Sequence, residues 1–291
     1  MQWDLKMKTD IPLIEKELKN NVKMVALVAP SFVVNFEYPQ FIHQLRDLGF
    51  DKVVELTFGA KMINREYHEQ LSLQKKELRK KESNFLISTT CPGIVSIINE
   101  KYPQYVKNLI KIDSPMIAMA KICKKTYPKH KTCFTTPCNF KKTEAEDSKY
   151  IDYVIDYQQL DELFLKNKIK MNNNHIHFDK FYNDYTKIYP LSGGLSKTAH
   201  LKGVLKKGEE KTIDGIGGVM KFLDSPDKKI RFLDCTFCKG GCIGGPFTSK
   251  LPIKEKIKKI SRYMAIAKKE SIPLGRAVII KKASGINFKN S

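Results

Sequence analysis

Long apolar runs are missing from this 291-residue chain. The longest, Met24 to Val34, is interrupted by Pro30 and Ser31, whereas a transmembrane helix needs about 20 consecutive apolar residues. The amino terminus carries Asp4 and several lysines but no apolar stretch behind them, so the sequence shows no signal peptide. We therefore expect a cytoplasmic protein with no membrane partner.

Acidic residues are scarce relative to basic ones. The chain has 52 Lys and Arg against 31 Asp and Glu, which gives a formal net charge of +21. A nucleic-acid-binding protein usually gathers its positive charge on one helix or arm, but here the lysines are scattered among acidic residues. We expect no nucleic acid. Two explanations of the charge stay open: lysine-rich usage on solvated faces, and an acidic protein partner whose encounter long-range attraction would speed.

Low-complexity tracts, internal repeats and Pro- or Ser-rich linkers are also missing, so we expect one domain over residues 1–291. The apolar stretch Met24–Pro30 predicts a buried strand, Phe41–Leu48 a helix and Asp51–Leu56 a second strand, and these form a βαβ unit. Further strands are predicted at 85–88, 131–138, 153–155 and 230–234, and further helices at 61–81, 92–101, 158–165, 192–206 and 253–267. The expected fold class is α/β, with two lobes each built on a mostly parallel sheet flanked by helices.

The seven cysteines divide into two groups. We interpret Cys123, Cys133 and Cys235 as ordinary buried side chains, the usual state of a free cysteine. The other four lie in loops that follow predicted strands: Cys91, Cys138, Cys238 and Cys242. Ligands collect at the carboxyl ends of parallel strands, so we expect these four thiols to bind a metal centre.

Four thiolates suit either a 4Fe–4S cluster or zinc. Structural zinc sites normally have two short Cys-x-x-Cys hooks, which this sequence lacks. Between Cys238 and Cys242, the pair Gly240-Gly241 lets the backbone fold over a metal centre without a Cβ. The spacing predicts a metal site and favours the cluster.

The residues around these cysteines resemble those of a known family. Three stretches match its signature loops in order and spacing: Thr89-Thr90-Cys91-Pro92-Gly93, residues 137–144, and residues 238–245. Shorter matches occur at Ala29-Pro30-Ser31, Tyr102-Pro103, Ser114-Pro115-Met116 and Ser192-Gly193-Gly194. From Val25 to Gly245 the chain thus resembles the catalytic H-domain of FeFe hydrogenases, without an accessory ferredoxin-like domain.

The resemblance implies an H-cluster in the cleft between the lobes. In that cofactor a cysteine thiolate, here similar to Cys242, joins a 4Fe–4S cluster to a di-iron unit that carries carbonyl, cyanide and a bridging dithiolate. Lys141 matches a lysine that donates a hydrogen bond to a cyanide, and Glu144 matches a carboxylate near it, so we expect an ion pair. The residues expected to line the di-iron pocket are Ala29, Pro30, Ser31, Ser114, Pro115, Thr136 and Thr236.

The sequence departs from this family in its proton relay. Thr90 stands where the family has a cysteine that donates protons, and a hydroxyl does not ionise usefully near neutral pH. The other relay positions carry neither a carboxylate nor a serine: Tyr67, Gln70 and Ile110. Glu66 and Glu69 are candidate substitutes. These changes leave cofactor binding intact and predict slow turnover.

Three functions remain open. The first is a minimal hydrogenase that interconverts protons and H2, the second is an H2-sensing protein with slow turnover, and the third is an iron–sulfur protein that keeps only the 4Fe–4S cluster. The first two imply maturation proteins that supply the di-iron unit. An acidic ferredoxin-like carrier is the expected electron donor.

Overall fold

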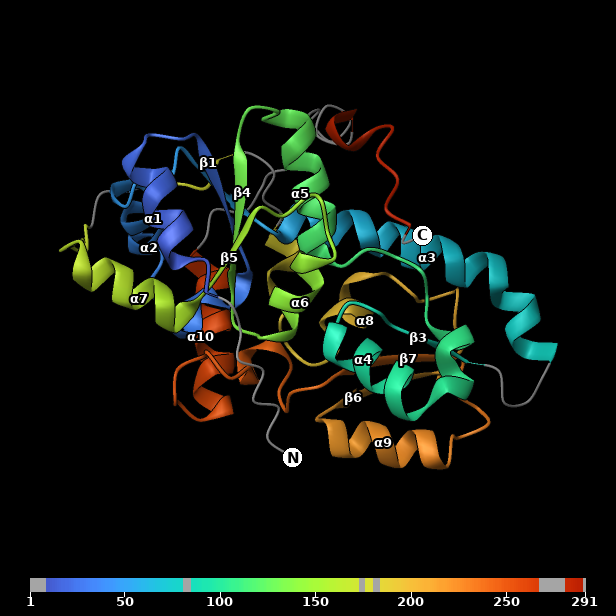
Figure 1. Cartoon of the computed structure of the whole chain (residues 1–291). Helices are drawn as coiled ribbons and strands as arrows, with labels where there is room; N and C mark the ends of the chain where they lie inside the picture. The colour runs from blue at the N-terminus through green and yellow to red at the C-terminus, as the bar shows by residue number, and fades with distance from the viewer. Residues whose placement is uncertain (1–8, 81–84, 173–175, 180–183, 267–280, 290–291) are drawn as a thin grey trace.

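The computed structural model describes residues 9–80, 85–172, 176–179, 184–266 and 281–289. Its strands form two sheets with the orders β2-β1-β4-β5 and β3-β7-β6, and every pairing between these strands is parallel. The strands are β1 (Met24–Val28), β2 (Lys52–Glu55), β3 (Leu86–Ile87), β4 (Lys131–Thr136), β5 (Tyr153–Asp156), β6 (Glu210–Asp214) and β7 (Phe232–Thr236). The two sheets lie in separate halves of the molecule (Figure 1), which confirms the predicted α/β class.

Helices cover both faces of each sheet. One face of the first sheet packs against α1 (Ile11–Lys19), α2 (Gln40–Asp47), α7 (Tyr157–Lys166) and α10 (Ile253–Ile266). The outer face of the second sheet packs against α4 (Pro92–Lys101) and α9 (Ile216–Asp224). Two short helices, α6 (Phe140–Glu146) and α8 (Gly194–Thr198), follow β4 and precede β6. Across the described ranges, no helix has the length and apolar character needed to cross a membrane.

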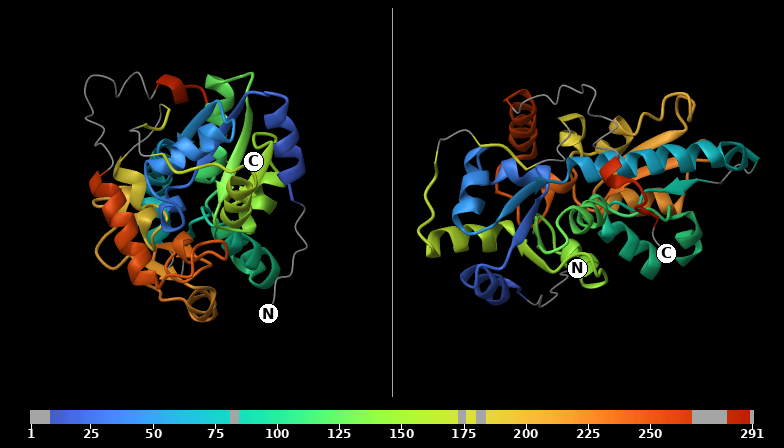
Figure 2. Two further views of the ribbon diagram at one scale, coloured as in Figure 1. Left: turned by 90° about the vertical axis from the view of Figure 1, so that its left-hand side faces the viewer. Right: turned by 90° about the horizontal axis from the view of Figure 1, so that it is seen from above.

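A central layer made of α3 (Thr57–Lys80) and α5 (Pro115–Thr126) joins the lobes. Side chains of β1 alternate between two cores, with Met24 facing α1 and α2 and Val25 facing α3 and α5. The core around α3 and α5 also contains Leu86 and Phe232 of the second sheet. In the right-hand view of Figure 2 the long helix α3 extends from the first lobe along the second. One continuous core therefore fixes the two sheets relative to each other.

Some predicted boundaries were wrong. The helix predicted at 61–81 begins at Thr57, and the helix predicted at 192–206 spans only Gly194–Thr198. The latter stops early because His200 (φ 53°) and Gly203 (φ 87°) adopt left-handed backbone conformations, which a right-handed helix does not accommodate. The helices and strands that the sequence did not predict are α1, α5, α6, α9 and β6.

A buried polar cluster fixes the carboxyl end of β2. The Glu55 carboxylate is fully buried and lies 2.6 Å from the Lys187 ammonium, whose side chain is 2% exposed. Tyr263 of α10 and Thr57 of α3 donate hydrogen bonds to the same carboxylate. Glu55 therefore ties together three segments that are distant in sequence, and the charge on each partner is compensated inside the protein.

We expect Lys187→Met to destabilise the fold by about 3–5 kcal/mol, because the substitution leaves the Glu55 charge buried without its cation. The double variant Glu55→Gln/Lys187→Met should recover most of that loss, since the buried charge is gone while the amide still accepts hydrogen bonds. Urea denaturation of both variants checks this. Equal stabilities for the single and the double variant would contradict it.

Candidate metal centre

The predicted ligands come from both sheets. Cys138 follows β4 of the first sheet by two residues, and Cys238 follows β7 of the second sheet by two residues. Cys91 follows β3 and immediately precedes α4, where its backbone is extended (φ −104°, ψ 105°). Cys242 begins the 3-10 turn 242–244. The cysteine loops therefore lie where the carboxyl ends of the two sheets meet.

The structure brings the four thiols into electrostatic range of one another. Burial of the Cys138 thiol, and after it the nearby charge of Cys91, raise the pKa of Cys138 to about 11. Cys242 is exposed as a residue, yet burial of its thiol, reinforced by Cys91 and Cys138, raises its pKa to about 12. Burial and the other three cysteines also raise the pKa of Cys238. The thiols of Cys138, Cys238 and Cys242 therefore stay protonated near neutral pH until a metal replaces the protons.

The thiols do not converge on a single point. In the part of the chain that the structure describes, no group of three His, Cys, Asp or Glu side chains could hold one metal ion. A 4Fe–4S cluster binds each thiolate to a different iron, so its ligands need not meet at one atom. The donor set, four cysteines on loops from two sheets, has the chemistry of an iron–sulfur site.

Two threonines set the turns that carry the ligands. The Thr136 hydroxyl accepts a hydrogen bond from the backbone N–H of Cys138 and donates one to its carbonyl, both at 3.1 Å. The Thr236 hydroxyl donates to the Cys238 carbonyl at 3.3 Å. Hydroxyl-to-backbone bonds of this kind stabilise tight turns. Thr136 and Thr236, predicted to line the di-iron pocket, thus shape the ligand loops.

The loop after β7 rests on the segment that follows residue 189. Cys242 donates its backbone N–H to the Pro190 carbonyl at 2.8 Å. Gly241, at φ +84°, lies so close to this segment that a Cβ would be 2.5 Å from the same carbonyl oxygen. A larger residue would push the loop away. This contact explains why glycine precedes the exposed ligand.

Backbone N–H groups point at two of the sulfur atoms. Phe237 donates its N–H to Cys91 Sγ at 3.5 Å. The backbone N–H groups of Phe140 and Lys141 hydrogen-bond the Cys138 thiol and favour its thiolate. Hydrogen bonds to the ligating sulfurs are among the factors that set the potentials of iron–sulfur clusters. The residues present therefore fit such a cluster.

The lysine that the resemblance singles out is held between two of the loops. Lys141 Nζ lies 2.5 Å from the Glu144 carboxylate and donates to the Thr90 carbonyl at 3.3 Å. The Lys141 and Glu144 side chains are 13% and 19% exposed. The expected ion pair is therefore present, and its cation favours the thiolates of Cys138 and Cys242.

The loop at residues 29–31 lies near the same centre. The hydroxyl groups of Ser31 and Tyr157 are 2.7 Å apart and buried, and Tyr157 also donates to the Ala29 carbonyl at 3.5 Å. A thiolate at Cys242 would raise the pKa of Tyr157, which burial already raises. Tyr157 could not be predicted from the sequence, because 126 positions separate it from Ser31.

Ser114 and Pro115, by contrast, begin a helix. The Ser114 side chain caps α5 by accepting the backbone N–H of Ile117, and Pro115 is the first residue of that helix.

Two of the three positions predicted to match the relay, Tyr67 and Ile110, lie on a chain of hydrogen bonds that runs through Thr89 and not through the Thr90 side chain. Tyr67 is fully buried and accepts the backbone N–H of Thr89 at 2.8 Å. The Thr89 hydroxyl donates to the Ile110 carbonyl at 2.7 Å, so it accepts from the Tyr67 hydroxyl at 3.0 Å. The chain ends at a carbonyl, which has no proton to pass on. Burial also raises the pKa of Tyr67.

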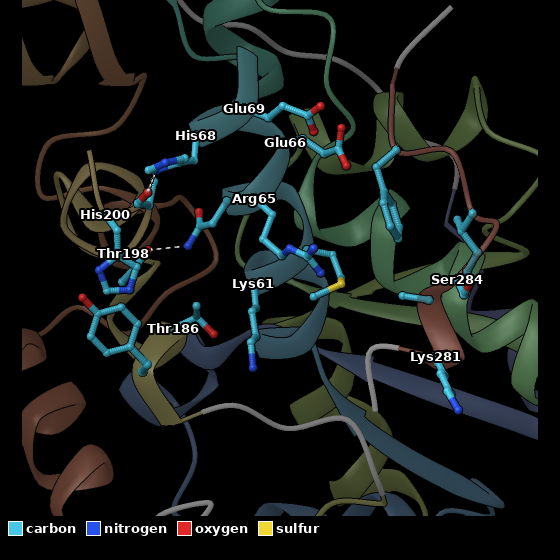
Figure 3. A pocket seen from close by; sticks show the side chains of 17 residues that line it. Lys61, Arg65, Glu66, His68, Glu69, Thr186, Thr198, His200, Lys281 and Ser284 are labelled. Carbon is cyan, nitrogen blue, oxygen red and sulfur yellow. Dashed lines mark hydrogen bonds between the residues drawn. The ribbon is translucent and has the colours of Figure 1, made fainter. Parts of the chain in front are cut away.

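A separate cavity of about 940 Å³ lies along α3 and is lined by none of the predicted ligands. Glu66 and Glu69 lie next to each other on one side of it, and Lys61 and Lys281 lie on another (Figure 3). Burial, followed by the neighbouring charge of Glu69, raises the pKa of Glu66. The two candidate substitute acids therefore face this cavity.

Known proteins are similar to this chain in sequence and in fold. The profile of the family described as "Iron only hydrogenase large subunit, C-terminal domain" matches residues 22–246. Iron hydrogenase 1 of Clostridium pasteurianum is 26% identical over 69% of this chain. The chain spans 44% of the length of that relative.

Solved structures share the fold. A variant of the [FeFe]-hydrogenase HydA1 from Chlamydomonas reinhardtii is 17% identical, with a TM-score of 0.71 over 94% of this chain and 93% of that one. A HydA structure described in terms of stepwise H-cluster assembly is 18% identical, with a TM-score of 0.68 over 88% of each chain. The profile match covers most of the chain, so the protein belongs to the iron-only hydrogenase large subunit, C-terminal domain family.

Proposed function

We propose that this protein holds an H-cluster and catalyses the reversible reduction of protons to H2. Cys91, Cys138 and Cys238 would bind the 4Fe–4S cluster, and Cys242 would join it to the di-iron unit. The observation that supports this most strongly is that loops from two sheets bring four thiols together beside Lys141. The di-iron unit supplies the hydrogen chemistry when bound, and the protein supplies binding, orientation and an environment low in water.

Lys141 would orient the di-iron unit. An ammonium has three donors, and Lys141 directs hydrogen bonds to Glu144 and to the Thr90 carbonyl. The remaining N–H can be donated to a cyanide. Residues Ala29, Pro30 and Ser31 would form the wall of the pocket near Cys242, held by Tyr157.

Electrons would enter the 4Fe–4S cluster from an acidic ferredoxin-like carrier in the cytoplasm. The net charge of +21 supports this proposal, because opposite charges speed the encounter of two proteins. Maturation proteins would supply the di-iron unit.

The chain of hydrogen bonds at Tyr67 favours a second candidate function, H2 sensing with slow turnover. A positioned acid or base typically contributes about 10²- to 10⁴-fold to a rate. The hydrogen bonds of Tyr67 and Thr89 instead end at the Ile110 carbonyl. The same cofactor could then report on H2 without fast catalysis. Infrared spectra would be alike for both candidates, and the turnover rate separates them.

The ligand set is tested by replacing one cysteine at a time. Cys91→Ser, Cys138→Ser and Cys238→Ser should each abolish the electron paramagnetic resonance signal of a 4Fe–4S cluster, because each removes the thiolate of one iron. Cys123→Ala and Cys133→Ala are the matched controls, since both thiols are buried in the core, and both should keep the signal. A full signal in the Cys138→Ser protein would remove Cys138 from the site.

The part played by Lys141 is tested separately from the cluster. Lys141→Ala should keep the 4Fe–4S signal and retain about 10- to 100-fold less of the di-iron unit, the range found when groups that orient metal ligands are lost. The infrared bands of iron-bound carbonyl and cyanide measure retention. The exposed Lys149→Ala variant is the control. Bands of unchanged intensity in Lys141→Ala would show that Lys141 does not hold the cofactor.

Thr90 is the position where a proton donor could be restored. Thr90→Cys should raise H2 evolution, with a gain below the about 10²- to 10⁴-fold of a complete acid–base catalyst, because Tyr67 and Ile110 still interrupt the relay. Thr90→Ala should be equal to the parent or slower. H2 evolution is compared at equal cofactor occupancy, judged by infrared bands. An unchanged rate in Thr90→Cys would mean that proton supply through this position does not limit turnover.

A further inference from the structure

Two phenyl rings lie between the cysteine loops and have no part in the chemistry proposed above. Phe140 is two residues beyond Cys138, and Phe237 directly precedes Cys238. Their ring centroids are 4.8 Å apart, with an angle of 58° between the planes. Both residues are partly exposed. The pair therefore lies at the protein surface next to two of the proposed ligands.

The third cysteine loop closes against the same pair. A Cβ on Gly93, two residues beyond Cys91, would lie 2.7 Å from the Phe140 ring and 3.1 Å from Phe237 Cβ. Glycine is thus required here for the rings to come close. The N–H of Phe237 donates to Cys91 Sγ at 3.5 Å. The helices α4 and α6 are in contact (Figure 1), and Gly93 and Phe140 lie in their first turns.

We propose that Phe140 and Phe237 form a cap that keeps water away from the 4Fe–4S cluster and thereby holds its reduction potential low. The inference rests on the four-cysteine site proposed above. Reduction adds a negative charge to the cluster, and water stabilises that charge better than an apolar surrounding does. The apolar shell of a metal site controls solvent access, and with it the potential. A low potential suits a centre that passes electrons towards protons.

The test uses protein that carries only the 4Fe–4S cluster, so it does not depend on turnover. A redox titration followed by electron paramagnetic resonance gives the potential, and the rate of iron loss to a chelator gives the exposure of the cluster. Phe140→Ala, Phe237→Ala and the double variant should shift the potential upward. The double variant should lose iron about 10-fold faster or more, as for other losses around a metal site.

Two further variants test whether the apolar cover, and not phenylalanine itself, sets the potential of the cluster. Phe140→Leu/Phe237→Leu keeps an apolar cover and should stay closer to the parent than the double alanine variant in both measurements. Gly93→Ala keeps both rings but displaces Phe140, so it should shift the potential upward. Alanine also favours helix over glycine, so this change should not weaken α4.

Phe222→Ala is the control for lost packing, since it removes one ring of the Phe85–Phe222 pair of the same lobe, whose centroids are 5.6 Å apart. This variant should be less stable but should keep the parental potential. The proposal that the two rings form a cap would be wrong if the double alanine variant kept the parental potential. It would also be wrong if Phe222→Ala shifted the potential by the same amount as the double alanine variant. A parent protein without a cluster signal would contradict the four-cysteine site itself and the cap with it. A normal parent signal with unmoved potentials would contradict the cap alone.

Discussion

The meeting of the cysteine loops at the carboxyl ends of two parallel sheets is the constraint on which the rest of the structure depends. Cys138 lies in a loop that follows a strand of the first sheet, whereas Cys91 and Cys238 lie in loops that follow strands of the second sheet. The thiols are therefore neighbours only while the two lobes keep one relative position. The core around α3 and α5 enforces that position, because it contains side chains of both sheets. Separating the lobes would expose this apolar core, at a cost of about 25 cal/mol per Å².

Within that frame, the ligand loops are shaped by ordinary protein contacts. Thr136 and Thr236 each stand two residues before a cysteine, and each hydroxyl donates to the carbonyl of that cysteine. The first sheet and the second sheet thus use the same turn to present a ligand. Because side chains and backbone hold these turns, the loops have their form independently of any bound group, which lowers the entropic cost of binding one.

Periodicity and apolar runs were enough to predict the buried strands. β1 is apolar throughout because it is covered on both faces, and β2, β4 and β7 combine apolar with β-branched residues. β6 escaped prediction because every residue in it is at least partly exposed, so it has no apolar run. The early end of α8 depends on the left-handed backbone at His200, which the residue type alone does not encode. Contacts such as Ser31–Tyr157 and Phe140–Phe237 join distant positions and required the folded structure.

The hydrogen bonds of Tyr67 also limit how this protein can change. Its hydroxyl accepts the N–H of Thr89, and Thr89 in turn is bonded to the Ile110 carbonyl. A carboxylate introduced at position 67 could accept the same N–H, but it would place a negative charge in a fully buried site, where the loss of solvation penalises it. A substitution there is therefore costly unless the position that shares these hydrogen bonds changes with it. The effect of a mutation at position 67 then depends on the residue at position 89, so the two positions are energetically coupled.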